Sequence, residues 1–165
     1  MTQIIYAIDP GITGGIVAVN TEGKILSGMR MPVTDFYNGK KQKKKIVHAF
    51  ELMKFFADQE MFTSQQSQVV IERVHSMPAQ GVTSAFSFGR ATGAAEAVAI
   101  AAVGVINVHW VEPRVWKQHF KLDSDKNKSQ NLATEIFGGK HWSRKVDNGI
   151  AEAALIAIYF LDRIN

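Results

Sequence analysis

The feature that most constrains the fold is an apolar run that ends on an acid and is followed by a glycine-rich turn. Residues 4–8 are all apolar, Asp9 closes the run, and residues 10–15 contain one proline and three glycines. A second apolar run follows at Ile16–Asn20. Short apolar runs bounded by glycine and proline are typical of buried strands. We therefore predict a β-hairpin made of Ile4–Asp9 and Ile16–Asn20.

A third strand and a helix are expected next. Lys24–Met31 can add an antiparallel strand, which Pro32 ends because proline donates no hydrogen bond to a neighbouring strand. After a polar loop we predict an amphipathic helix, because apolar residues recur at intervals of four, three and four. These residues are Ile46, Phe50, Met53 and Ala57.

The rest of the chain alternates between strands and helices. Three antiparallel strands followed by this alternation predict an α/β domain with a mixed sheet flanked by helices. The length of 165 residues and the 46% hydrophobic content fit a single domain, residues 1–165. The expected elements are strands at Gln68–Val74 and Val105–Val111 and helices at Val82–Ala102, after Pro113, at Lys128–Phe137 and from Asp147 to Ile164.

Composition excludes several classes of site. The chain has no cysteine, so a disulfide framework, a thiolate zinc site and a cysteine nucleophile are ruled out, and any metal must bind oxygen or nitrogen. The longest apolar stretch, Ala91–Trp110, is interrupted by Glu96 and His109, which argues against a membrane span. The first nine residues lack the features of a signal peptide. We expect a cytoplasmic protein with no membrane partner.

Basic residues are clustered rather than spread evenly. Nineteen Lys and Arg against fifteen Asp and Glu give a net charge of +4, but five lysines fall within residues 40–45 and others crowd the last third. Such clusters are expected where a protein contacts phosphates. The lysine run could instead be a solvated loop or the start of a helix. The candidate DNA-binding residues are Lys40, Lys41, Lys43, Lys44, Lys45, Arg90, Arg114 and Lys126.

Three acids occupy apolar surroundings where an acid is costly. Asp9 ends the first strand, Glu72 follows Val69–Ile71, and Glu152 is the only charged residue between positions 150 and 160. A buried, unpaired carboxylate costs several kcal/mol, so each acid is expected to have a cation nearby. Strand ends and a helix packed on the sheet could bring the three together. Oxygen ligands of this kind suit Mg²⁺, with Mn²⁺ as a substitute.

A nuclease would explain this accumulation of carboxylates. Two ions about 4 Å apart can activate the attacking water and stabilise the leaving 3′ oxygen of a phosphodiester. Each acid also has a structural alternative. Asp9 could only form an Asx-turn, Glu72 could pair with Arg90, and Glu152 could extend from a helix edge to solvent.

Several motifs resemble those of the RuvC family of Holliday-junction resolvases. Ile8–Gly11 with Thr13–Gly15, and then Ile71–Val74, resemble the first two catalytic motifs. The resemblance is collinear and spans nearly the whole chain. The other matching segments are Phe88–Ala95, which resembles the start of the family's long helix, Glu112–Lys117, Lys128–Gln130 and Ala151–Ala157.

The resemblance implies an RNase H-like fold and a homodimer that nicks two opposed strands of a four-way DNA junction, using Mg²⁺ and a water nucleophile. Such an enzyme serves DNA recombination and repair in a bacterial cell or phage-infected host. By motif position, Asp9 and Glu72 would bind metal and Glu152 would replace the usual Asp. Lys117 and Lys128 would support the scissile phosphates. The long helix from residue 82 would contribute to the two-fold interface.

Two positions depart from the family pattern. The family places an Asp three residues before the last acid, where this chain has Gly149, while Asp147 lies five residues before Glu152. Five residues of helix turn through about 500°, so Asp147 and Glu152 would face about 140° apart. Asp147 is either a further metal and catalytic ligand, aimed inward from the helix N-cap, or only a cap. His75 replaces an aromatic residue and could stack on an unpaired base or contact a phosphate.

Two other functions remain open at this point. An RNase H-type nuclease of the same architecture would prefer an RNA–DNA hybrid to a four-way junction. A junction-binding protein that no longer cleaves is suggested by the missing acid at Gly149. It would bind junctions tightly in EDTA and leave them intact in Mg²⁺.

Overall fold

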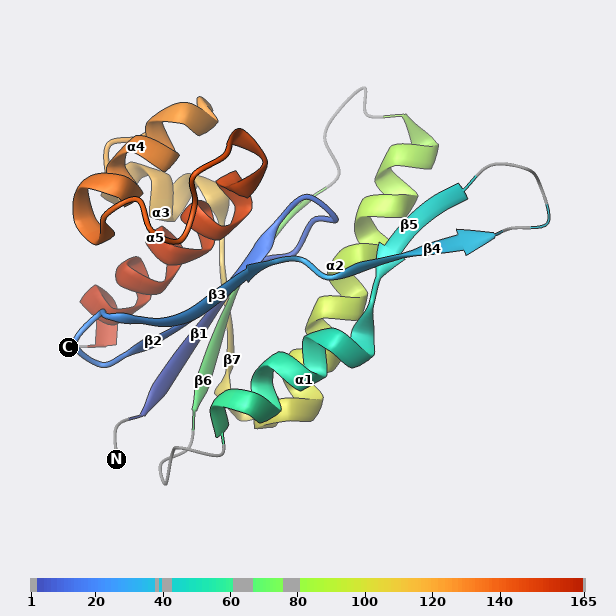
Figure 1. Cartoon of the computed structure of the whole chain (residues 1–165), viewed down its shortest axis with the longest axis horizontal. Coiled ribbons are helices and arrows are strands. Elements are labelled where there is room, and N and C mark those ends of the chain that lie inside the picture. The colour runs from blue at the N-terminus through green and yellow to red at the C-terminus, as the bar shows by residue number, and fades with distance from the viewer. Residues whose placement is uncertain (1–2, 38, 40–42, 61–66, 76–80, 165) are drawn as a thin grey trace.

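The protein is described by a computed structural model that covers residues 3–37, 39, 43–60, 67–75 and 81–164. Its centre is a five-stranded mixed sheet in the order β3-β2-β1-β6-β7 (Figure 1). The first three strands are antiparallel, and β6 and β7 continue the sheet in parallel with β1. This confirms the predicted fold class. The strands are β1 (Ile4–Asp9), β2 (Gly15–Asn20), β3 (Ile25–Arg30), β6 (Gln68–Glu72) and β7 (Val108–Val111).

Helices cover both faces of the sheet, as Figure 1 shows. Side chains alternate along β1, so that Ile5 and Ala7 join the core beneath α5, whereas Tyr6 and Ile8 join the core beneath α1 and α2. One face carries α3 (Pro113–His119), α4 (Lys126–Phe137) and α5 (Asn148–Ile164), and the other carries α1 (Ala49–Glu60) and α2 (Val82–Val103).

Within the described residues, no helix is both long enough and apolar enough to cross a lipid bilayer.

The predicted amphipathic helix is confirmed as α1, but it begins at Ala49, and the expectations of a polar loop before it and of Ile46 within it are wrong. β4 (Val33–Tyr37) and β5 (Lys43–Val47) form a separate two-stranded hairpin, in which Ile46 pairs with Thr34. The two β-branched residues that end β5 favour a strand. The buried face of α1 also differs from the predicted stripe, since Phe50 is 72% exposed. The residues of α1 that are buried in the core are Leu52, Phe55 and Phe56, and Met53 of the predicted stripe packs against this core.

Smaller corrections concern where elements begin and end. Gly104 stops α2 with a φ of 80°, a left-handed value that favours glycine. Val105–Asn107 then forms a 3₁₀ turn, so the following strand begins only at residue 108. The strand expected to reach Val74 ends at Glu72. Helix α4 starts two residues before the predicted Lys128, because Asp125 caps it by accepting a hydrogen bond from the Asn127 backbone N–H.

Candidate active site

Two of the three predicted acids lie side by side at one edge of the sheet. Strands β1 and β6 run parallel with Ile8 opposite Ile71, and each strand ends one residue later, at Asp9 and at Glu72. Ala7 and Val70 pack in the core beneath α5. Because side chains point to the same face at every second residue, both acids project toward α5.

Helix α5 brings the third acid to the same place. Glu152 lies in the buried first half of α5, and its side chain is only 7% exposed, so it does not extend to solvent. Its Oε1 lies 3.4 Å from Lys117 Nζ, and its Oε2 lies 3.7 Å from Lys126 Nζ. Oε1 is buried and accepts no hydrogen bond from the described residues. This oxygen is therefore available to a further cation.

The ionisation of these acids reflects their crowding. Burial raises the pKa of Asp9 to about 7, helped by the negative charges of Glu72 and Glu152 and opposed by Lys126 and a hydrogen bond from the Gly11 backbone N–H. Burial also raises the pKa of Glu72, and the charge of Glu152 adds to this. Two buried carboxylates and the half-buried Glu72, whose negative charges repel one another, favour uptake of either protons or a cation.

Trp116 orients Glu72, a contact that the sequence does not predict. The indole Nε1 donates to Glu72 Oε1 at 3.0 Å, and the Trp116 side chain is fully buried. The alternative pairing of Glu72 with Arg90 is wrong, since Arg90 instead lies over the Phe36 ring at 4.8 Å from its centroid. Trp116 lies within the Glu112–Lys117 segment noted above, but nothing in its spacing indicates a contact with an acid 44 residues away.

Among the candidate lysines, the structure places Lys117 and Lys126 beside the acids. Both form ion pairs with Glu152. Lys128, to which the resemblance assigned support of the scissile phosphate, is exposed and paired with Asp123. Lys126, assigned above only to DNA binding, is therefore the α4 lysine that contacts the acidic group.

Helix α5 is placed by a close contact between two glycines. Gly14, in the β1–β2 turn, forms a parallel bridge with Gly149 at the start of α5. A Cβ added to Gly149 would lie 2.3 Å from the carbonyl carbon of Gly14, closer than packed atoms come. The position where the family carries an Asp thus has no room for a side chain here.

We predict that Gly149→Ala destabilises the protein by about 2–3 kcal/mol, because the methyl group would force the β1–β2 turn away from α5. Chemical denaturation measures this directly. Gly139→Ala is the matched control, since a Cβ there makes only an ordinary contact, at 3.7 Å from Thr134 Cγ2. A Gly149→Ala protein as stable as wild type would contradict the close contact.

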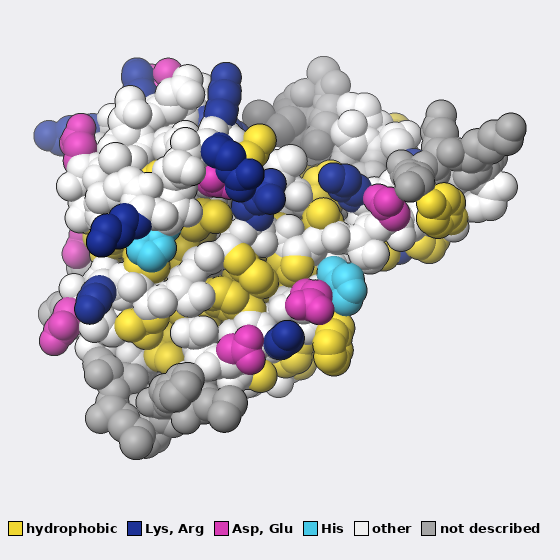
Figure 2. Space-filling model, viewed as in Figure 1, with side chains coloured by type: hydrophobic (Ala, Val, Ile, Leu, Met, Phe, Trp, Pro, Cys, Tyr) yellow, Lys and Arg dark blue, Asp and Glu magenta, His cyan; other side chains and the backbone are white. Residues whose placement is uncertain are grey.

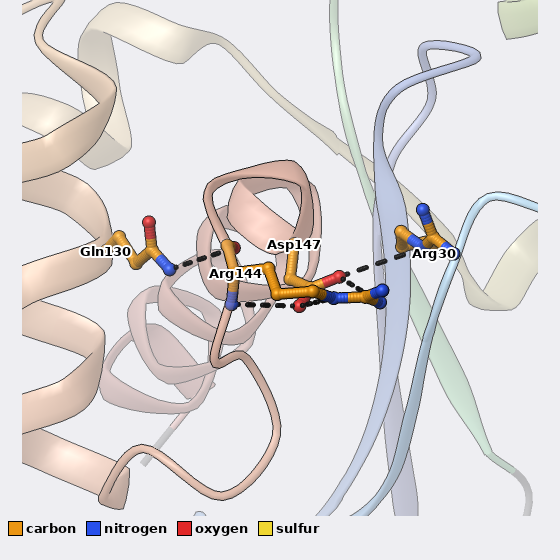
Figure 3. A network of polar contacts seen from close by, with 4 residues as sticks. All are labelled: Arg30, Gln130, Arg144 and Asp147. Atoms are coloured by element: carbon orange, nitrogen blue, oxygen red, sulfur yellow. Dashed lines mark hydrogen bonds and ion pairs between the residues drawn. The ribbon is translucent and has the colours of Figure 1, made fainter.

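Asp147 is held by two arginines (Figure 3). It is buried in the 3₁₀ turn Lys145–Asp147. Its carboxylate accepts hydrogen bonds from the Arg144 backbone N–H at 3.2 Å and from the Arg144 guanidinium at 3.3 Å, and it lies 3.7 Å from Arg30 Nε. Burial alone would raise the pKa of Asp147, but these hydrogen bonds and charges lower it. Asp147 therefore holds the side chains of Arg144 and Arg30 in place.

The remaining DNA-binding candidates are dispersed. Lys44 and Lys45 line a cavity of about 330 Å³ together with Arg90 and Phe36. His75 Nε2 lies 3.2 Å from Glu112 Oε1. Lys40, Lys41 and the Lys43 side chain lie outside what the structure describes, and Arg114 lines a groove shared with Lys117.

The acidic group suits a divalent cation, although its side chains are not yet close enough together to bind one. In the described part of the chain, no three acidic or histidine side chains are close enough to form a complete metal site. The negative charges of Glu72 and Glu152 nevertheless help to raise the pKa of Asp9, that of Glu152 helps to raise the pKa of Glu72, and Glu152 Oε1 lacks a hydrogen-bond donor among the described residues. All three side chains offer carboxylate oxygens, which Mg²⁺ and Mn²⁺ prefer as ligands.

Comparison with solved structures establishes the fold. The chain is similar to Thermus thermophilus RuvC in complex with a Holliday junction substrate, with 23% sequence identity, a TM-score of 0.63, and coverage of 99% of this chain and 96% of that one. A second Thermus thermophilus RuvC structure matches with 19% identity and a TM-score of 0.56, covering 98% and 96%. No protein-family model and no curated protein sequence matches the chain. The RNase H-like fold of RuvC is thus present at low sequence identity.

Proposed function

We propose that the protein is a Mg²⁺-dependent endonuclease that resolves four-way DNA junctions. The observation that carries this is the group of Asp9, Glu72 and Glu152, in which Asp9 and Glu152 are buried, Glu72 is half-buried, and two lysines form ion pairs with Glu152. Burial and crowding raise the pKa of Asp9 from 3.8 to about 7, so the metal-free protein loses stability as the pH rises from about 4 and the loss is complete above pH 7. A function that requires a cation explains why the fold retains them.

In this proposal Asp9, Glu72 and Glu152 hold the metal, and Asp147 does not. Bound Mg²⁺ would activate water and stabilise the charge that develops on the phosphodiester. Asp9 must first lose its proton, and Trp116 keeps Glu72 oriented through its indole N–H. Lys117 and Lys126 neutralise Glu152 before the cation arrives. They are then free to turn toward the nonbridging oxygens of a phosphate.

Three observations support a four-way DNA junction as the substrate. The sequence motifs are collinear with those of the RuvC family, and the fold is that of a RuvC solved with a Holliday junction. Lys and Arg side chains also gather in the middle of the face drawn in Figure 2, between the α3–α5 region and the β4–β5 hairpin. A basic surface beside an acidic site suits a nuclease better than a small-molecule hydrolase.

A homodimer would supply the two sites that paired incision requires. Helix α2 carries a stripe of exposed apolar or small residues at helical spacing, in which Val82 is 86% and Phe86 71% exposed. A Cβ at either glycine of the stripe would meet nothing within 4 Å, so a second helix could approach closely. The stripe consists of Val82, Phe86, Gly89, Gly93, Ala97 and Ile100.

A panel of substrates tests the proposed function. The protein is incubated in Mg²⁺ with a synthetic four-way junction, a linear DNA duplex and an RNA–DNA hybrid, each end-labelled on every strand in turn. We expect nicks at symmetric positions on two opposed strands of the junction, and little cutting of the duplex. Preference for the hybrid would favour the RNase H alternative. Junction binding in EDTA without nicks in Mg²⁺ would favour the non-cleaving alternative.

A further inference from the structure

A groove beside the acidic site is lined by basic side chains from four separate elements. It has a volume of about 800 Å³ and runs past the β1–β2 turn at Ile12 and Thr13. Among the described residues that line it, none is acidic. A groove of this charge suits a ligand with several negative charges. Its basic residues are Arg30 at the end of β3, Lys45 in β5, Lys126 at the start of α4, and Lys145 in the 3₁₀ turn.

The groove leads directly to the acidic site. Lys126 belongs to both, since it lines the groove and lies 3.7 Å from Glu152 Oε2. The register of the sheet gives a second connection, because Asp9 pairs with Gly15 and Gly15 pairs with Arg30. Two strand spacings are about 10 Å, so Arg30 lies within a few nucleotides of a phosphate held at Asp9. Gly15 has no side chain, and the start of α5 packs against it, since a Cβ there would lie 2.7 Å from Ile150 N.

Asp147 fixes the arginine at the wall of this groove. Its buried carboxylate lies 3.7 Å from Arg30 Nε, while the Arg30 side chain as a whole remains 54% exposed. A guanidinium group has five N–H donors, so the contact with Asp147 leaves several for another ligand. Holding a long side chain in one conformation reduces the entropy lost when that ligand binds.

We propose that this groove holds the phosphodiester backbone of the strand that enters the acidic site, with Arg30 as a phosphate contact positioned by Asp147. The inference rests on the proposed function and adds the path of the strand, toward β3 and the β4–β5 hairpin. Four cations distributed over several elements suit successive phosphates along a chain better than one small anion. Neither Arg30 nor Lys145 belongs to a sequence motif noted above.

The salt dependence of junction binding tests whether the groove holds the phosphodiester backbone. Binding of a four-way junction is measured in EDTA over a range of salt concentrations for wild type, Arg30→Gln and Lys145→Gln. The slope of log affinity against log salt should decrease by about 0.9 for each phosphate that the variant no longer neutralises. Lys24→Gln is the matched control, because Lys24 is exposed just before the opposite end of β3 and should leave the slope unchanged.

Asp147→Asn distinguishes positioning from simple charge. Removing a negative charge beside the groove would by electrostatics alone tighten DNA binding. If Asp147 positions Arg30, the variant instead binds the junction more weakly and shows a smaller salt slope. Circular dichroism establishes that each variant is folded. Tighter binding by folded Asp147→Asn would overturn the positioning role.

The outcomes separate this inference from the proposed function. If wild type cuts junctions and both Arg30→Gln and Lys145→Gln keep the wild-type salt slope, the groove inference alone is overturned. If wild type does not bind junctions at all, the proposed function fails and the groove inference with it. Inorganic phosphate serves as a further probe. If it binds the wild type, loses affinity in Arg30→Gln, and the DNA slope stays unchanged, the groove is a small-anion site and the proposal is wrong.

Discussion

Glu72→Gln is expected to lower the rate of junction cleavage about 1,000-fold while leaving junction binding intact. The amide keeps the shape of the side chain but removes a charged ligand from a site where the cation contributes several kcal/mol of transition-state stabilisation. Asp9→Asn should have an effect of similar size. Cleavage is measured in single-turnover reactions with Mg²⁺, and binding is measured separately in EDTA.

Glu96→Gln provides a closely matched control for this experiment. Glu96 also accepts a hydrogen bond from an indole N–H, that of Trp110 at 2.9 Å, but it lies in α2 on the other face of the sheet. Its replacement should leave cleavage near the wild-type rate. Cleavage by Glu72→Gln within tenfold of wild type would remove Glu72 from the proposed metal site.

Asp9→Asn is expected to stabilise the metal-free protein by up to about 4 kcal/mol at pH 8. The pKa of Asp9 in the folded protein is about 7, against an ordinary value of 3.8. A raised pKa contributes stability that is complete below pH 3.8 and is lost as the pH rises through 7, at about 1.4 kcal/mol per pH unit. The neutral amide avoids this loss. The raised pKa of Glu72 also lowers stability as the pH rises, in wild type and in Asp9→Asn alike.

The measurement is urea denaturation in EDTA at pH 4 and pH 8. Wild type should be less stable than Asp9→Asn at pH 8, and the free energies of unfolding of the two proteins should be similar at pH 4. Added Mg²⁺ should stabilise wild type at pH 8 and have much less effect on the variant. Asp58→Asn, at an exposed position of α1, controls for the charge change. An identical dependence on pH for wild type and Asp9→Asn would show that Asp9 does not titrate near neutrality.

The sheet and its acids could be predicted because local sequence determines them. Five apolar residues before Asp9, and a glycine-rich turn after it, leave few alternatives to a buried strand that ends on an acid. The β4–β5 hairpin was not predicted because the spacing of Ile46 with the following apolar residues matches a helix by coincidence. The strand forms because residues 43–47 pair with residues 33–37. Such pairing is not visible in a short window of sequence.

The details of the site depend on contacts between distant segments. The sequence does not decide whether Asp147 is a ligand or a cap, because the helical angle to Glu152 carries no information about Arg30, which reaches Asp147 from β3. Similarly, the family motif pointed to Lys128, whereas the start of α4 brings Lys126 to Glu152. Lys126 and Lys128 both lie at the start of α4, and the contact of Lys126 with Glu152 depends on how α4 packs beside α5.

The most direct test of the proposed function is cleavage of a supercoiled plasmid that extrudes a cruciform, in the presence of Mg²⁺. Two coordinated nicks across the junction convert the plasmid to a linear product, whereas a single nick gives only a relaxed circle. Wild type should produce linear plasmid with ends at the cruciform base. Gly93→Glu places a charge in the exposed α2 stripe. This variant should shift the product toward nicked circles. Equal cutting of a plasmid without a cruciform, or the absence of linear product from wild type, would contradict paired resolution of a four-way junction.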